Sequence, residues 1–225
     1  MRGCGGVGNY QLPWYHSGDT KDLSMVVKWV SSQPRLTVGG VYLVGFSIGG
    51  NITLNYLSEG RDIPIRAAAA VSVPVDLAGS ALTLATPRNR MYMRYLLAPL
   101  KDRIKSKYAL FPDRVDISGL DEIVTFAEFD ERFTAPIHGF PSASVYWNSQ
   151  SSLRRLSAIK VRSLLVSALD DPFLSVSCYP KDPHILGDSV FAEYPRHGGH
   201  VGFLTGLQNQ HRWISKRLLE FFTEK

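Results

Sequence analysis

Residues 45–49 read GFSIG and directly follow the apolar run VYLV at residues 41–44. A serine with a glycine two positions before it and another two positions after it is typical of a nucleophile elbow. This sharp turn lifts a serine hydroxyl off the end of a strand and begins a helix. Because the serine holds a strained backbone conformation, we expect close approach of strand and helix to require both glycines. Residues 52–57, ITLNYL, are compatible with that helix. The pattern predicts Ser47 as a nucleophile.

An acid follows in the chain order that this kind of site requires, which is Ser, then Asp or Glu, then His. Residues 161–168 have the pattern of a buried strand and lead into Asp170 and Asp171. Ligands and catalytic groups of open α/β sheets collect at the carboxyl ends of the strands. We predict Asp171 as the acid because it lies directly before Pro172, at the turn from strand to loop. Asp170 is the alternative, and we expect it to cap the turn or to remain solvated.

A glycine-rich loop, PRHGGHVGF at residues 195–203, follows a short predicted strand at residues 189–194. Its glycines allow tight folding, which can place an imidazole over the serine. We predict His200 as the base because it precedes an apolar helix start, and His197 is the alternative. A serine hydroxyl becomes a useful nucleophile when a neutral imidazole takes its proton. A carboxylate then orients that imidazole and stabilises its charged form.

Six motifs occur in order along nearly the whole chain. They are RGCGG at residues 2–6, YHSG at 15–18, GFSIGGN at 45–51, EFD at 128–130 with TAPIHGF at 134–140, DDPF at 170–173 and HGGHVGF at 197–203. Together they resemble the YheT-like α/β-hydrolases, family 4 of the AB hydrolase superfamily. The resemblance implies an α/β-hydrolase fold with Ser47, Asp171 and His200 as nucleophile, acid and base. It also implies hydrolysis of carboxylic esters, including medium-chain acyl esters or phospholipids, or acyl transfer to alcohols.

The resemblance further implies a segment of roughly a hundred residues before the RGCGG motif, carrying the first strands of the sheet. We therefore expect a truncated product or an incomplete gene model, with a fold that is N-terminally incomplete. In this fold the oxyanion hole uses the backbone N–H after the nucleophile, here that of Ile48, and a second N–H from an earlier loop. The alternative function is a non-catalytic hydrolase-fold protein without a complete oxyanion hole. The strand at residues 41–44 would lie at an open edge, where a partner chain could cover it.

Strand and helix patterns alternate, which predicts one α/β domain, residues 1–225, with a mostly parallel sheet and flanking helices. We predict a helix at residues 21–30 and a strand at residues 65–73. Residues from about 77 to 155 lack strand periodicity and are interpreted as an inserted helical cap. The final helix is predicted at residues 209–222, and its apolar face comprises Trp213, Ile214, Leu218, Leu219 and Phe222.

The net charge of +5 includes one dense basic cluster within the predicted cap. Its members are Arg88, Arg90, Arg94, Lys101, Arg103, Lys105 and Lys107. No nucleic-acid motif accompanies them, so nucleic-acid binding is not predicted. We expect the apolar face of this segment to cover the acyl site. Its basic face would then meet solvent, an anionic headgroup or a membrane surface.

Several other polar residues invite functional interpretations. We interpret His16 and His138 as substrate-binding or loop-ordering residues and favour loop ordering. Glu128 and Asp130 could form a carboxylate pair for acid–base chemistry, but we expect them to tie the cap to the sheet.

Neither a metal nor another cofactor is predicted. His197 and His200 stand three residues apart, but no third ligand has suitable spacing. The cysteines, Cys4 and Cys178, suggest no disulfide framework. The first residues lack the apolar region of a signal peptide, so a cytoplasmic location is expected. The predicted partner is a small-molecule or lipid ester.

Overall fold

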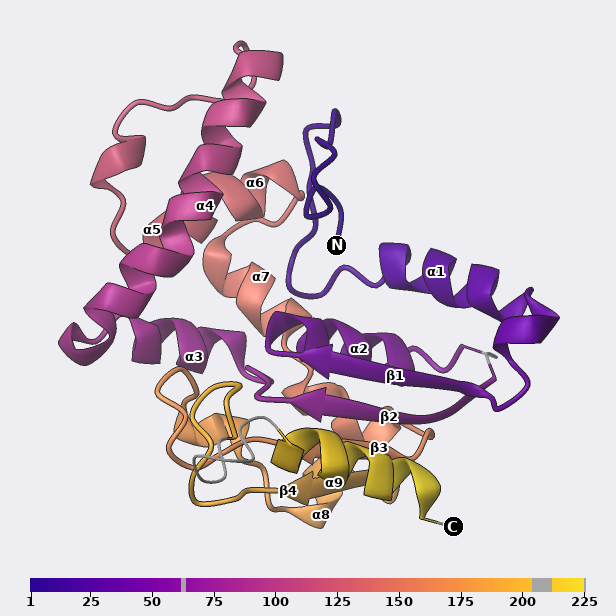
Figure 1. Cartoon of the computed structure of the whole chain (residues 1–225). Coiled ribbons are helices and arrows are strands. Elements are labelled where there is room, and N and C mark those ends of the chain that lie inside the picture. The colour runs from indigo at the N-terminus through magenta and orange to yellow at the C-terminus, as the bar shows by residue number, and fades with distance from the viewer. Residues whose placement is uncertain (62–63, 204–211, 225) are drawn as a thin grey trace.

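A parallel four-stranded sheet forms the centre of the computed structural model, which describes residues 1–61, 64–203 and 212–224 (Figure 1). The strands lie in the order β1 (Val41–Phe46), β2 (Ile65–Val71), β3 (Ser163–Val166) and β4 (Val190–Glu193). Every neighbouring pair is parallel. All four carboxyl ends therefore meet at one edge of the sheet. The predicted α/β fold and all four predicted strands are confirmed. The observed ends of the strands differ from the predicted ones by a few residues.

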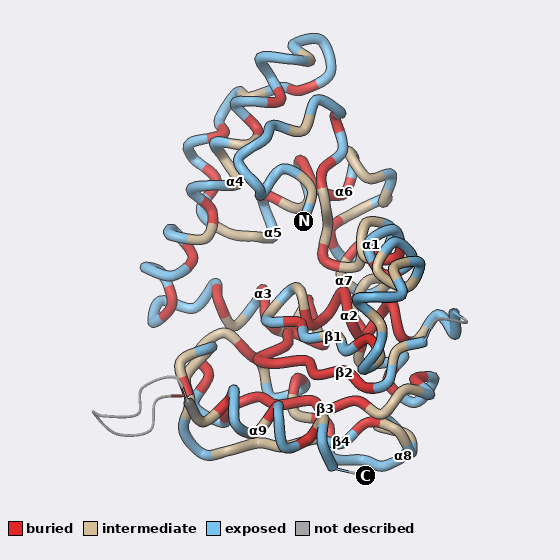
Figure 2. The backbone as a smooth tube through the Cα atoms, turned by 45° about the vertical axis from the view of Figure 1, so that its right-hand side comes forward, coloured by how far each residue is buried: buried red, intermediate tan, exposed pale blue. Residues whose placement is uncertain are grey.

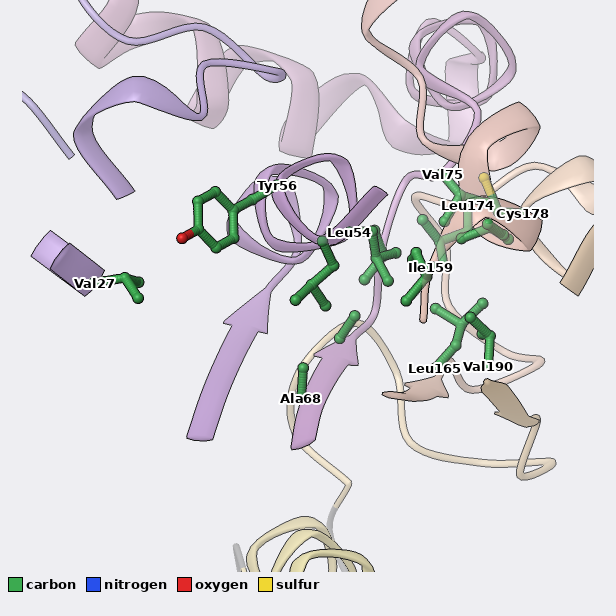
Figure 3. Packing of buried hydrophobic residues seen from close by; sticks show 14 residues of the cluster. Val27, Leu54, Tyr56, Ala68, Val75, Ile159, Leu165, Leu174, Cys178 and Val190 are labelled. Atoms are coloured by element: carbon green, nitrogen blue, oxygen red, sulfur yellow. The ribbon is translucent and has the colours of Figure 1, made fainter. Parts of the chain in front are cut away.

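Helices cover both faces of the sheet. On one face lie α1 (Lys21–Ser31) and α2 (Ile48–Ser58), and on the other lies α9 (Arg212–Thr223) (Figure 1). Side chains from α2, β2 and β3 pack together in an apolar core on one face of the sheet. Leu54, Tyr56 and Leu165 are buried members of this core (Figure 3). The alanines of β2 and the leucines of β3 are buried, as expected for strands covered on both faces.

The apolar face predicted for the final helix is partly wrong. Ile214, Leu218 and Phe221 are buried against the sheet, while Leu219 is 65% exposed. Positions 214, 218 and 221 are spaced four and three residues apart, which keeps them on one side of a helix with 3.6 residues per turn. Residues 209–211 of the predicted helix lie outside the described residues.

Between β2 and β3 the described chain forms helices and loops and no strand. Most of this part of the chain lies above the sheet in Figure 2. The helices are α3 (Leu77–Leu84), α4 (Arg90–Leu110), α5 (Phe126–Phe129), a π-helical turn (Asp130–Thr134), α6 (Ala135–Ile137) and α7 (Ala143–Gln150). We refer to residues 77–150 as the helical segment. A separate apolar core, which includes Met93, Ile104 and Phe129, holds it together. The delimitation of an inserted cap over about residues 77–155 stays a prediction.

Shorter helices occupy the connections elsewhere. The helix α8 (Pro183–Leu186) precedes β4. Short 3₁₀ helices lie at Pro34–Leu36, Leu153–Ala158 and Val176–Cys178, and two more, Pro87–Asn89 and Leu120–Glu122, lie within the helical segment. Within the described ranges, no helix combines the length and apolarity needed to cross a bilayer. The cytoplasmic location stays a prediction.

The first residues of the chain pack along the helical segment. Leu12 and Trp14 belong to its apolar core. The ammonium group of Lys107 donates hydrogen bonds to the backbone carbonyls of Asn9 and Gln11. The expectation that the whole basic cluster faces outward is therefore wrong for Lys107, which is 3% exposed. Its charge is used to hold the N-terminal segment, because backbone carbonyls are good acceptors for a buried ammonium group.

Strand β1 lies at the edge of the four-stranded sheet, as predicted. Tyr42, Val44 and Phe46 alternate along it, and all three side chains are exposed to a substantial degree. Tyr42 contacts Phe222 of α9, with ring centroids 5.0 Å apart. An apolar edge strand of this kind can accept another strand. The partner chain expected to cover it stays a prediction.

Candidate active site

Ser47 lies at the sharp turn between β1 and α2. Its backbone has φ 51° and ψ −124°, a strained conformation for a residue with a side chain. A Cβ atom at Gly45 would lie 2.4 Å from the backbone oxygen of Gly49, and one at Gly50 would lie 2.4 Å from Val73 Cγ2. A Cβ at Gly49 would meet only Met1, at an ordinary 3.7 Å. Close approach thus requires glycine at positions 45 and 50, and the expectation that it also does so at Gly49 is wrong.

The structure brings Ser47, His200 and Asp171 into one chain of hydrogen bonds. His200 Nε2 lies 2.9 Å from Ser47 Oγ, and His200 Nδ1 lies 2.8 Å from Asp171 Oδ2. Because an ionised carboxylate only accepts, Nδ1 carries the proton that points to Asp171. Nε2 is then free to accept the serine proton. The ring of His200 also packs against Phe173, with ring centroids 4.4 Å apart.

Asp171 is held rigidly. Its side chain is fully buried, and its second oxygen, Oδ1, accepts the backbone N–H of Phe173 at 2.9 Å. The adjacent loop is tied to the helical segment by Asn89, whose amide donates to the carbonyls of Pro172 and Thr83. These contacts fix the carboxylate in the orientation that His200 needs.

The two alternative residues, Asp170 and His197, lie away from the serine. Asp170 Oδ1 accepts the backbone N–H groups of Gly198 and Gly199 at 2.9 and 2.8 Å. The His197 ring lies 3.3 Å from Asp170 Oδ2, and its side chain is 87% exposed. Partial burial alone would raise the pKa of Asp170, but the hydrogen bonds from the Gly199 N–H, His197 and the Gly198 N–H together lower it. Asp170 therefore stabilises the conformation of the loop that carries His200.

A cavity of about 230 Å³ is bordered by Ser47 and His200. It lies between the carboxyl edge of the sheet and the helical segment, which contributes Leu96 and Leu100 of α4 and Trp147 of α7. Most of its lining is apolar or aromatic. An apolar wall of this kind suits the hydrocarbon part of a ligand.

Ile48 borders the same cavity and is the first residue of α2. The N–H groups of the first helical turn lack intrahelical acceptors, and the helix dipole places partial positive charge there. The backbone N–H of Ile48 is therefore suited to an oxygen that becomes negative next to Ser47.

His16 and His138 pack together one layer behind the cavity. Their ring centroids are 4.9 Å apart, and His138 also meets Trp14 edge to face at 5.4 Å. His16 Nδ1 accepts the backbone N–H of Gly18 at 3.2 Å. Neither ring borders the cavity. The geometry favours the loop-ordering alternative, and a substrate-binding role stays a prediction.

Burial, followed by the proximity of His16, lowers the pKa of His138 from 6.5 to about 4. Burial also lowers the pKa of His16. Between pH 6.5 and 4 the unfolded chain consequently binds more protons than the folded one. Because bound protons then favour unfolding, stability is lost as the pH falls through this window.

The unfolding free energy of the wild type decreases between pH 6.5 and 4, and we expect this decrease to be about 1–2 kcal/mol smaller in His138→Phe. The figure is discounted for solvent screening of a half-buried ring. Phenylalanine retains the ring packing and removes the titration. Urea denaturation at several pH values measures the effect. The matched control is His184→Phe at an exposed position. An unchanged pH slope in His138→Phe would contradict the expectation.

Glu128 and Asp130 do not tie the helical segment to the sheet as expected. Glu128 forms a capping box with Thr125 at the start of α5. Asp130 Oδ2 accepts the indole N–H of Trp147 at 2.8 Å, which joins two parts of the helical segment. Burial raises the pKa of Asp130 to about 6, although hydrogen bonds from Thr134 and Trp147 act in the opposite direction. The local sequence explains the correction, because Thr125 stands three residues before Glu128, the spacing of a capping box.

Asn51 is a buried residue whose structural role was not predicted. Its amide donates to the carbonyls of Ser17 and Gln150 at 2.7 and 2.9 Å, and its oxygen accepts the N–H of Ser152 at 3.0 Å. It therefore joins α2 to the N-terminal segment and to the end of α7. The available signal was a polar residue directly after the glycines of the elbow, at the start of a helix that is buried.

Comparison with known proteins places these observations in a family. The chain is 35% identical over 227 residues to YheT of Escherichia coli (strain K12), a protein named as an esterase; the alignment covers 99% of this chain and 66% of YheT. The chain belongs to the α/β-hydrolase family. It is also 30% identical over 226 residues to phospholipase ABHD3 of Mus musculus, covering 99% of this chain and 54% of that protein. This α/β-hydrolase chain thus spans between half and two thirds of the length of these relatives. No family model matches it.

Solved structures support the fold of this α/β-hydrolase. An esterase of Pyrococcus furiosus superposes with a TM-score of 0.55 at 18% identity, covering 98% of this chain and 66% of that one. An acylaminoacyl peptidase of Pyrococcus horikoshii superposes with a TM-score of 0.52 at 18% identity, covering 91% and 27%. At these identities the likeness extends to the fold alone.

Proposed function

We propose that this chain carries the catalytic residues of a serine hydrolase that cleaves carboxylic esters through an acyl-enzyme. One observation carries the proposal: Ser47, His200 and Asp171 are linked by hydrogen bonds of 2.9 and 2.8 Å at the wall of an apolar cavity. The names of the relatives, which include an esterase and a phospholipase, agree with ester chemistry.

In the proposed reaction, Ser47 Oγ attacks the ester carbonyl while His200 Nε2 takes its proton. The backbone N–H of Ile48 donates to the carbonyl oxygen as negative charge develops on it. Asp171 stabilises the imidazolium that forms. His200 then protonates the leaving alcohol, and the acyl group remains on Ser47. Water, or an alcohol in the case of acyl transfer, attacks the acyl carbon while His200 takes its proton. The bond between the acyl group and Ser47 Oγ then breaks, and His200 returns the proton to Ser47 Oγ.

The volume of the cavity bears on the size of the acyl group that it can hold. Its volume of about 230 Å³ is smaller than the roughly 300–1,000 Å³ of pockets that hold drug-sized ligands. Short- and medium-chain acyl esters, including those of lipids, are therefore the proposed substrates.

A fluorophosphonate probe tests the proposal. Such probes react with a serine whose hydroxyl is activated by an imidazole, so we expect one adduct, on Ser47. Peptide mass spectrometry locates it, and Ser17 and Ser80, which border the same cavity, serve as internal controls. Absence of the adduct, or equal labelling of the three serines, would favour the alternative of a non-catalytic hydrolase-fold chain.

A further inference from the structure

Arg103 borders the cavity that contains Ser47 and His200. Leu96, Leu100 and Arg103 of α4 are spaced four and three residues apart, so they share one face of the helix. The face turned toward the cavity thus carries two leucines followed by a cation. An ionised group in an apolar wall is costly unless a partner compensates its charge.

The contacts of Arg103 leave most of its five N–H donors unused. Nη2 lies 3.7 Å from the sulfur of Cys4, a weak acceptor, and Nη1 is buried without a hydrogen-bond partner. Among the described residues, no carboxylate forms an ion pair with Arg103. Buried donors are rarely left unpaired in native proteins. The guanidinium therefore lacks an acceptor, which an ordered water or an anion can supply, and of these two only an anion also compensates its charge.

The neighbouring groups do not supply that acceptor. Lys105 pairs with Asp121 on the outside of the helical segment. Asp130 is an acid that borders the same cavity, but its carboxyl is engaged by Trp147 and Thr134. The guanidinium carbon of Arg103 lies 4.9 Å from the ring centroid of Tyr15, which limits its rotation. A held guanidinium presents a fixed fork that matches the oxygens of carboxylates and phosphates.

We propose that Arg103 binds an anionic oxygen group of the substrate, a phosphate or a carboxylate, at a distance from the reacting carbonyl. This inference rests on the proposed function and narrows it. The ester would place its hydrocarbon part along Leu96 and Leu100, with its anionic end at Arg103. Neutral esters would lack the second contact and bind more weakly.

Ligand binding to the Ser47→Ala protein tests the proposal without turnover. Calorimetric titration compares hexyl phosphate, hexanoate, 1-hexanol and inorganic phosphate. We expect at least one of the two anionic amphiphiles to bind more tightly than 1-hexanol. Adding Arg103→Met should weaken that binding about 10- to 100-fold, the usual worth of a hydrogen bond to a charged group. Arg94→Met is the matched control, because Arg94 is exposed on the same helix and its loss changes the net charge equally.

Arg103→Lys provides a second variant in case the methionine variant is poorly folded. It keeps the charge without the planar fork, and we expect intermediate affinity. Equal binding of hexyl phosphate, hexanoate and 1-hexanol would overturn the proposal, as would equal losses in Arg103→Met and Arg94→Met. Inorganic phosphate binding as tightly as hexyl phosphate would also overturn it, because the site would then serve free phosphate. None of these binding results affects the test of Ser47 with the fluorophosphonate probe. A failure of that probe to label Ser47 likewise leaves the binding assay valid, because the assay uses the Ser47→Ala protein.

Discussion

Ser47→Ala is expected to reduce hydrolysis of p-nitrophenyl butyrate to the background rate. In the proposed reaction the hydroxyl oxygen of Ser47 forms the acyl-enzyme, and among the described residues no other hydrogen bond to His200 Nε2 offers a replacement. Removing the serine of a triad costs about 10⁶-fold in kcat where it has been measured in other enzymes. Release of p-nitrophenolate, followed by absorbance, gives the steady-state rate.

Ser80→Ala is the matched control for this loss. Ser80 borders the same cavity, but its hydroxyl lies 3.3 Å from Cys178 Sγ and not next to the histidine. We expect this variant to retain most of the wild-type rate. Substantial hydrolysis by Ser47→Ala would show that the reaction takes a route without the acyl-enzyme.

Asp171→Asn is expected to lower kcat by about 10⁴-fold, as the equivalent exchange does in a serine protease. The asparagine fits the same space, but its NH₂ group can face His200 Nδ1 and favour the tautomer that carries its proton on Nε2. That tautomer cannot accept the proton of Ser47. Because substrate binding does not use Asp171, the loss should appear in kcat with little change in KM.

Asp170→Asn is the comparison that decides between the adjacent acids. Its carboxylate accepts two backbone N–H groups of the loop around His200, and asparagine retains one oxygen for them. We expect a loss of 10-fold or less, about the effect of one weakened neutral hydrogen bond. A larger loss in Asp170→Asn than in Asp171→Asn would reverse the assignment of the acid.

The sheet and the convergence of Ser47, Asp171 and His200 could be predicted because each depends on local sequence. The elbow needs glycine at position 45 for steric reasons, and the acid and the histidine follow recognisable strands. Parallel strands then bring the ends of all these segments to one edge. The preference for His200 over His197 agrees with the observed geometry, although residues 201–203 form a turn and not the helix start that was the reason for it.

The surroundings of the site could not be predicted, because they depend on contacts between distant segments. Arg103 and Lys107 lie four residues apart in one basic cluster, yet one borders the cavity and the other is buried against the N-terminal segment. Periodicity places them on one side of a helix without saying what that side meets. Leu219 and Phe221 are a second example. Both are apolar residues of the final helix, and only the packing of this helix on the sheet decides that Phe221 is buried and Leu219 exposed.

The bonds made by Asn51 have a consequence for how the chain acquires its structure. Its partners are 34, 99 and 101 residues away in sequence. Contacts between such distant residues close large loops and tend to form late in folding. During synthesis, which proceeds from the N-terminus, the helix behind the serine can gain these last two bonds only after residue 152 has left the ribosome. The helix that follows Ser47 is therefore fixed to the rest of the fold at a late stage, after that helix and the strand before it have been made.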